Sequence, residues 1–165
     1  MSTIARPRGT ARSGDRDASA AREDGQGFSG RLVLEIRPGD RMLVNGAALQ
    51  FRSRASVVLS NRARFLYGKQ IMAPEEARTP VRRVYFAMQN AYMAEEEEER
   101  SRFAGLARDL AEEYRVATTS PTAREILRAA LEDMEGGRCW EAMRRVRELF
   151  AHDDAVLGLA GAAQA

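Results

Sequence analysis

The segment "NRARFLYGKQIMAPEEARTP", residues 61–80, marks the change from a β-rich half of the chain to a helical half. Within it, "RFLY" has the apolar and aromatic residues of a short strand, which Gly68 stops. Thr79 and Pro80 then form a helix start, because threonine is a good N-cap and proline suits the first helical position. The segment therefore predicts a junction between two kinds of structure, and arginines flank it on both sides.

The residues before this junction predict a small antiparallel sheet. Their apolar runs "LVLEI", "RMLV", "AALQF" and "ASVVLS" are separated by short turn sequences. Pro38 and Gly39 form one turn, and Asn45 with Gly46 is a strong hairpin signal because both residues tolerate positive φ. We expect a meander of four or five short strands over residues 30–72.

The residues after the junction predict helices with apolar stripes. The first two stripes comprise Val81, Val84, Tyr85, Met88 and Tyr92, and then Phe103, Leu106, Leu110 and Tyr114. Tyr92 and Phe103 are eleven residues apart, which is about three helical turns. One long helix is therefore expected to carry both stripes, with an acidic waist at Glu96 and Glu99 between them.

The last third of the chain predicts a helical hairpin. Ser120 and Pro121 repeat the helix-start signal, and the glycines at 136–137 end that helix. A final apolar stripe runs from Trp140 to Phe150. The predicted fold class is therefore α+β: a small N-terminal antiparallel β-meander, followed by a long helix and a C-terminal helical hairpin.

Composition divides the chain into one domain and two flanking segments. Residues 1–29 have almost no large apolar side chains and cannot bury enough surface to offset the entropy of ordering, which predicts a disordered tail. Residues 30–154 are expected to form a single domain, β-rich over 30–72 and helical over 74–154. Residues 155–165 are expected to be a frayed C-terminus.

Residue counts argue against several classes of function. One histidine and one cysteine leave no Cys-His or Ser-His-Asp set for catalysis, no cluster for zinc and no internal disulfide. No apolar run approaches the ~20 residues of a membrane-spanning helix. We therefore expect a cytoplasmic protein that is not an enzyme, needs neither a metal nor another cofactor, and has no membrane partner.

Opposite charges are separated along the chain, although the formal net charge is only +2. Residues 31–83 hold eleven basic and four acidic residues, a balance of +7, whereas residues 95–165 hold ten basic and sixteen acidic residues, a balance of −6. Arginine forks match phosphate geometry, and their planes stack on bases. The candidate RNA-binding residues are Arg37, Arg41, Arg52, Arg54, Arg62, Arg64, Lys69, Arg82 and Arg83.

Aromatic residues and acidic residues leave two interpretations open. Phe51 and Phe65 lie among the basic residues, as on surfaces that bind single-stranded nucleic acid, but both are expected in the core of so small a sheet. The acidic C-terminal half also suits a protein-interaction module, because amphipathic helices are recognised in grooves. For that alternative, the candidate partner-binding residues are Glu96, Glu99 and Trp140.

Three segments carry a family resemblance: "LEIRPGDRMLVNGAAL", "NRARFLYGKQIMAPEEARTPVRRVYFAMQNAYM" and "GGRCWEAMRRVRELF". Together they resemble FlbT, a family of flagellar biosynthesis regulators of alphaproteobacteria, over residues 32–154. The chain departs from the family pattern at Asp40, where glutamate is common. It also departs at Tyr67, Gly68 and Gln70, which stand in a stretch that is usually charged.

The resemblance implies a post-transcriptional regulator that associates with the 5′ untranslated region of flagellin mRNA and promotes its decay, together with the partner protein FlaF. It implies no catalytic residues, so decay would fall to cellular nucleases. The alternative is an adaptor or chaperone-like partner of flagellin or FlaF that acts on mRNA only indirectly. A sheet edge this early in the chain also invites a homodimer.

Overall fold

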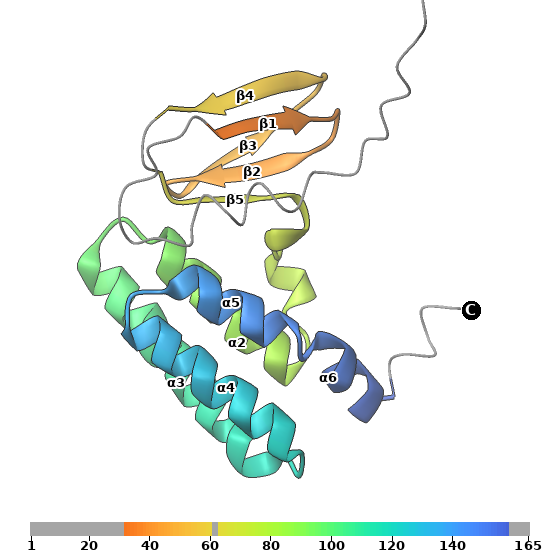
Figure 1. Cartoon of the computed structure of the whole chain (residues 1–165), viewed down its shortest axis with the longest axis vertical. Coiled ribbons are helices and arrows are strands. Elements are labelled where there is room, and N and C mark those ends of the chain that lie inside the picture. The colour runs from red at the N-terminus through yellow and green to blue at the C-terminus, as the bar shows by residue number, and fades with distance from the viewer. Residues whose placement is uncertain (1–31, 61–62, 159–165) are drawn as a thin grey trace, which may run out of the picture.

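The fold has three layers: two small sheets stacked on each other, and a layer of helices beneath the second sheet (Figure 1). The computed structural model describes residues 32–60 and 63–158. The strands are β1 (Leu32–Ile36), β2 (Arg41–Val44), β3 (Ala47–Gln50), β4 (Ala55–Leu59) and β5 (Phe65–Tyr67). An N-terminal group of antiparallel strands followed by helices confirms the predicted α+β class.

The strand order differs from that of a simple meander. β1 pairs with β4, while β2 lies between β3 and β5 in a separate sheet. Both predicted turns form. Asn45 (φ 48°) and Gly46 (φ 86°) join the paired strands β2 and β3, whereas Pro38 and Gly39 (φ 89°) turn the chain between β1 and β2, which do not pair. Burial explains the split: β1 alternates buried and exposed residues, so its apolar face needs a second sheet to cover it.

The residues of β5 alternate between two hydrophobic cores. Phe65 and Tyr67 face the core between the sheets, where Phe51 also packs, as expected. Leu66 points the other way, is 0% exposed and joins the helical core with Tyr85. Because neighbouring residues of a strand point to opposite faces, this short strand connects the layers.

Two of the helices, α2 (Pro80–Met93) and α4 (Pro121–Glu135), begin at the predicted caps. Thr79 Oγ1 accepts a hydrogen bond from the backbone N–H of Arg82 at 3.4 Å, and Ser120 Oγ accepts one from Ala123 at 3.2 Å. The helical elements are the 3₁₀ turns η1 (Gly68–Gln70) and η2 (Pro74–Glu76) and the helices α2 (Pro80–Met93), α3 (Glu97–Ala117), α4 (Pro121–Glu135), α5 (Cys139–Arg147) and α6 (Phe150–Val156). The last three contain the predicted helical hairpin, formed by α4 and α5.

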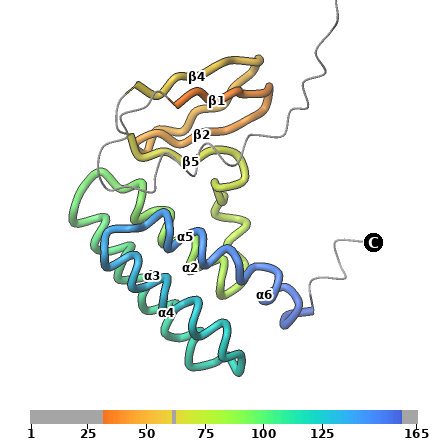
Figure 2. The backbone as a smooth tube through the Cα atoms, in the orientation of Figure 1, coloured from red at the N-terminus to blue at the C-terminus, as the bar shows by residue number. Residues whose placement is uncertain are grey.

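Residues 80–117 form two helices, so the single helix predicted through both apolar stripes is wrong. Ala94 is extended (φ −60°, ψ 131°), and α3 packs back against α2; Figure 2 shows the chain reversing between them. The Ala94 carbonyl accepts hydrogen bonds from Arg64 at 2.8 Å and from Arg100 at 3.1 Å, two cations at the negative end of α2. The reversal buries Ala107, which a continuous helix would leave without a partner surface.

The buried face of α3 is shifted from the predicted stripe. Tyr114 is buried as expected, but Leu106 is 46% exposed. Ala107 and Ala111 take the buried positions instead. Small side chains let two helices approach closely, so Ala107 and Ala111 mark the contact face of α3 together with Tyr114.

Two findings on the described residues concern membrane-spanning helices and metal sites. None of the described helices is both long and apolar enough to cross a membrane. Within residues 32–60 and 63–158, no group of three or more His, Cys, Asp and Glu side chains is placed to hold a metal ion. The predicted tail, residues 1–29, and the end of the chain from residue 159 lie outside the described residues.

Candidate nucleic-acid interface

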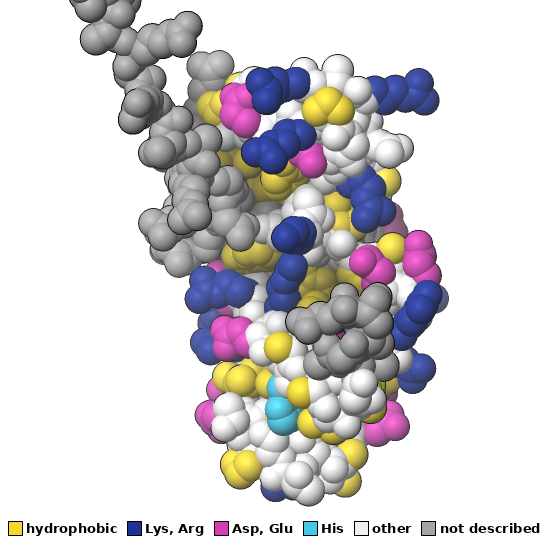
Figure 3. Space-filling model, turned by 90° about the vertical axis from the view of Figure 1, so that its right-hand side faces the viewer, with side chains coloured by type: hydrophobic (Ala, Val, Ile, Leu, Met, Phe, Trp, Pro, Cys, Tyr) yellow, Lys and Arg dark blue, Asp and Glu magenta, His cyan; other side chains and the backbone are white. Residues whose placement is uncertain are grey.

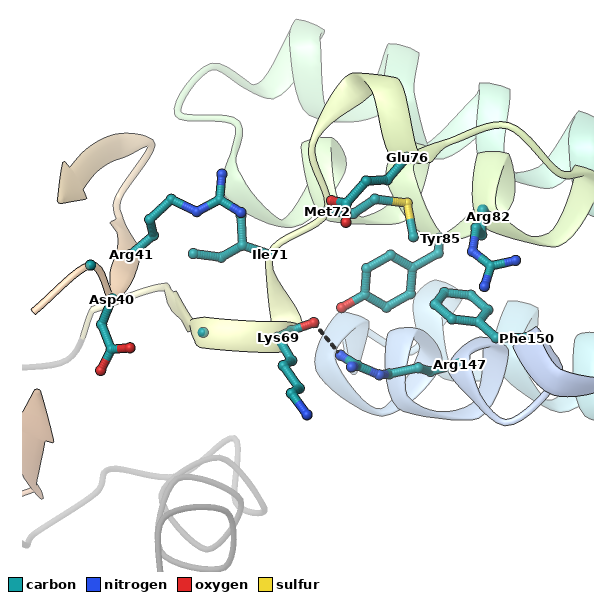
Figure 4. Close-up of a pocket in the computed structure, with 12 residues that line it drawn as sticks. Asp40, Arg41, Lys69, Ile71, Met72, Glu76, Arg82, Tyr85, Arg147 and Phe150 are labelled. Atoms are coloured by element: carbon teal, nitrogen blue, oxygen red, sulfur yellow. Dashed lines mark hydrogen bonds between the residues drawn. The ribbon is translucent and has the colours of Figure 1, made fainter. Parts of the chain in front are cut away.

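An open cleft of about 500 Å³ lies where the second sheet meets the helices (Figure 4). Its lining comes from β2 and the preceding turn, from η1 and the following loop, and from η2, α2, α5 and α6. Four cationic side chains, two carboxylates and two aromatic rings take part in this lining. The cleft therefore collects polar groups from both halves of the chain.

Three cations in the cleft are not in contact with a carboxylate of the described residues. They are Arg41 on β2, Lys69 on η1 and Arg147 at the end of α5. Within the described residues, none of the three forms a salt bridge. Arg147 Nη1 donates a hydrogen bond to the backbone carbonyl of Lys69 at 2.6 Å, which fixes α5 against η1 (Figure 4). The remaining N–H groups of this guanidinium stay available to a ligand.

The two carboxylates of the cleft are engaged by local hydrogen bonds. Asp40 Oδ2 accepts from the backbone N–H of Arg37 and from the Tyr67 hydroxyl, both at 2.7 Å. These bonds lower the pKa of Asp40, whereas burial and the neighbouring Asp40 raise the pKa of Tyr67 to about 12. Glu76 Oε2 accepts from the N–H of Ala73 at 2.6 Å. Asp40 and Tyr67 thus bind each other across 27 positions of the chain.

Arg82 is the fourth cation of the cleft, and its charge is compensated. Its guanidinium forms a two-pronged salt bridge with Asp154 on α6, and Nη2 lies 2.9 Å from Oδ2. The hydrogen bonds from Arg82 lower the pKa of Asp154. The same guanidinium lies 4.8 Å from the centre of the Phe150 ring, which meets Tyr85 edge-on at 5.4 Å. This predicted RNA-binding residue therefore also holds α6 on α2.

Three further candidate arginines lie together at one end of the sheets. In the β1–β4 ladder Ile36 is opposite Ala55, so Arg37, which follows β1, and Arg54, which precedes β4, lie at the same end. Arg52 lies in the same β3–β4 turn, and hydrogen bonds join this turn to the one before β2. All three are exposed, and none forms a salt bridge among the described residues.

We refer to the cations of the cleft and of the sheet end that form no salt bridge among the described residues as the cationic surface. Its members are Arg37, Arg41, Arg52, Arg54, Lys69 and Arg147. On the face drawn in Figure 3, Lys and Arg side chains lie over the sheet and its junction with the helices, with apolar side chains and some Asp and Glu side chains among them. The structure thus brings together most of the candidate residues of the sheet.

The remaining candidates are not part of this surface. Arg64 is half-buried and binds the Ala94 carbonyl, as described above. Arg83 is exposed on α2 but does not line the cleft. Arg62 lies outside the described residues. Arg147, in contrast, was not among the predicted residues. It comes from the acidic half of the chain, and only the packing of α5 brings it to Lys69.

The residues predicted to bind a protein partner lie in two different places, at the exposed start of α3 and against the helical core. Glu96 is the N-cap residue of α3 and Glu99 lies in its first turn, where the helix dipole favours negative charge. Both are exposed and line a shallow depression of about 220 Å³ with Glu98 and Arg102. Trp140 is partly buried against the helical core. The acidic waist is therefore the start of a helix, and its role in binding stays a prediction.

The fold and the cleft define a small α+β protein in which cations from a sheet and from a helix share one surface. The chain belongs to the FlbT family, because the family model described as "Flagellar protein FlbT" matches residues 32–157. This confirms the resemblance carried by the three sequence segments.

Relatives from several Brucella species are similar over most of their length. The chain is 31% identical to a Brucella anthropi protein over 133 residues, which cover 78% of this chain and 83% of the relative. It is 30% identical to proteins of Brucella ovis and Brucella melitensis over 132 residues, 77% of this chain and 82% of each relative. All three relatives are named "Probable flagellum biosynthesis repressor protein FlbT". No solved structure matches the chain significantly.

Proposed function

We propose that this protein regulates flagellum biosynthesis by binding the 5′ untranslated region of flagellin mRNA and promoting its decay. Family membership supports a regulatory role, since the Brucella relatives are named as flagellum biosynthesis repressors. The observation that carries RNA binding is the cationic surface, whose members are not ion-paired within the described residues. The protein acts in the cytoplasm without catalysis, and cellular nucleases degrade the bound message.

The cationic surface suits single-stranded RNA for two physical reasons. Phosphate groups supply most of the affinity of nucleic-acid complexes, and guanidinium forks bind them with two parallel hydrogen bonds. Unpaired bases stack on aromatic rings and on arginine planes, which paired bases cannot do. Arg37, Arg52 and Arg54 supply such forks at the end of the sheets, and Arg41 continues them into the cleft. An unpaired stretch of the leader is therefore the preferred ligand.

Replacing Arg52 and Arg54 together with alanine is expected to weaken binding to a flagellin leader and to reduce its salt dependence. Both side chains are exposed in one turn, so their loss removes phosphate contacts without opening the core. For single strands each contact contributes about 0.7 to the slope of log K against log salt, so two lost contacts reduce that slope by about 1.4. Filter binding at several salt concentrations measures the affinity and the slope.

The matched control is the double variant Arg102→Ala with Arg108→Ala. It changes the net charge equally, but on α3, where the two arginines pair with Glu99 at 3.9 Å and with Glu135 at 3.5 Å. We expect this control to bind the leader nearly as well as the wild type. Equal losses from both double variants, or binding that is indifferent to salt, would contradict an RNA interface on the sheet.

An adaptor that binds flagellin or FlaF is the second candidate function. It is favoured by the acidic start of α3 and by Leu106 and Val116, two apolar side chains that the same helix exposes. Under this alternative, Glu96→Lys with Glu99→Lys abolishes copurification of the partner from RNase-treated lysate of motile cells and leaves leader affinity intact. If this double variant keeps its protein partner but loses affinity for the leader RNA, the result would count against the adaptor.

A further inference from the structure

We propose that the cleft between the second sheet and the helices binds a single nucleotide. Its phosphate is held by Lys69 and Arg147, which lie side by side, and its base packs on the apolar side chains of Ile71 and Phe150. This inference rests on the proposed function in one respect: the nucleotide is taken to be part of RNA. It goes further by naming one place in the fold and the chemical unit that the place accepts.

The positive charges of the cleft favour an anionic ligand. Lys69 on η1 and Arg147 on α5 lie side by side, and Arg41 adds a third positive charge to the lining, although its guanidinium points away from the Lys69 ammonium group (Figure 4). None of the three forms a salt bridge within the described residues. Asp40 forms no salt bridge with them: it accepts hydrogen bonds from Tyr67 and from the Arg37 N–H, and it points away from the Arg41 guanidinium (Figure 4). Like charges gathered in a concave site raise the local concentration of an oppositely charged ligand. Guanidinium groups favour phosphate, whose oxygens match their fork.

The size and the apolar lining of the cleft favour a ligand that is larger than a phosphate ion and has an apolar part. A volume of about 500 Å³ is in the range of small-ligand sites, roughly 300–1,000 Å³. The rings of Tyr85 and Phe150 lie between Arg41 and Arg82 (Figure 4), and Ile71 adds a half-buried aliphatic side chain. A flat base gains van der Waals contact on such a wall. A nucleoside monophosphate offers both parts, an anion and an aromatic ring system.

Isothermal titration at low salt with AMP, adenosine and inorganic phosphate as separate probes tests this inference. We expect AMP to bind at least tenfold more tightly than adenosine or phosphate alone. Arg147→Gln should weaken AMP binding at least fivefold, whereas Arg144→Gln, an exposed position on α5 outside the cleft, should change it less than twofold. Adenosine binding as tightly as AMP, or no binding of AMP, would overturn the inference.

A second variant guards against an indirect effect of Arg147→Gln, which also removes the hydrogen bond to the Lys69 carbonyl. Lys69→Gln keeps that carbonyl and removes an exposed ammonium group that forms no salt bridge within the described residues. It should weaken AMP binding about as much as Arg147→Gln, with an unchanged Tm. AMP affinity that is unchanged in Lys69→Gln and in Arg147→Gln would remove the cleft from consideration.

Leader RNA separates this inference from the proposed function. RNA binding that requires Arg52 and Arg54 but is unchanged in Lys69→Gln would refute the cleft site and leave the RNA-binding function standing. AMP binding that requires Lys69, in a protein that retains no leader RNA, would support the cleft and refute the function.

Discussion

Replacing Leu66 with alanine is expected to lower the free energy of unfolding by about 3 kcal/mol. Leu66 is fully buried on β5 and packs into the helical core, while Phe65 and Tyr67 on either side face the core between the sheets. The substitution removes apolar contact and leaves a cavity at the place where the layers meet. Neither layer can close that cavity without moving away from its own partners, so the cost should be high for a single side chain.

Thermal and urea unfolding measure this loss. Far-UV circular dichroism follows the whole chain, and Trp140, the only tryptophan, reports on the helical core. A loss of about 3 kcal/mol corresponds to a fall in Tm of roughly 10 °C for a domain of this size. Leu49→Ala is the matched control, because it makes the same change at an exposed position on β3 and should cost less than about 1 kcal/mol. Equal Tm values for the two variants would mean that Leu66 does not hold the layers together.

Asp133→Asn is expected to lower the free energy of unfolding by about 2 kcal/mol. Asp133 is 6% exposed on α4. Arg138 donates to its Oδ1 from Nε at 3.0 Å and from Nη2 at 2.8 Å, and Arg145 donates to Oδ2 from Nε at 2.6 Å. The carboxylate thus ties α4 to the N-cap and to the last turn of α5. The cost stays below that of breaking a fully buried pair, about 3–5 kcal/mol, because both arginines reach solvent.

The effect of Asp133 should depend on pH. Burial alone would raise the pKa of Asp133, but the hydrogen bonds from Arg145 and Arg138 outweigh it and hold the pKa below its usual value. A carboxyl with a lowered folded pKa contributes stability that is complete above its unfolded pKa, about 3.9, and is lost as the pH falls through the folded pKa. The stability difference between the wild type and Asp133→Asn should therefore be complete at pH 7 and shrink below about pH 4.

Urea unfolding at pH 7 and at pH 3 measures this dependence. Asp109→Asn is the control, because it makes the same change at an exposed position on α3, and its effect should be close to zero at both pH values. A stability difference for Asp133→Asn that does not change between pH 7 and pH 3 would show that the charge of Asp133 is not what stabilises the hairpin.

The cationic character of the candidate site was predictable from the sequence, but its membership was not. Arg41 and Lys69 line the cleft without a salt bridge among the described residues. Arg64 and Arg82 belong to the same basic stretch, yet folding engages them with the Ala94 carbonyl and with a carboxylate on α6. Arg147 comes from the acidic half and takes a place in the cleft. Counting charges along a chain does not show which of them folding will pair.

The sequence by itself determined the features that depend on neighbouring residues. The Asn45–Gly46 turn, the Thr79 and Ser120 caps and the change from strands to helices all follow from steric limits or hydrogen bonds within a few residues. These interactions are the same wherever the segment lies in the folded chain.

The tertiary structure alone decided the strand order, the reversal at Ala94 and the site. The pairing of β1 with β4 is decided by the need to cover an apolar face, and the bond from Arg64 to Ala94 joins residues thirty positions apart. The meeting of Arg147 with Lys69 spans 78 positions. Each depends on surfaces that exist only once distant elements have packed, because burial is a property of the whole fold and not of a local sequence pattern.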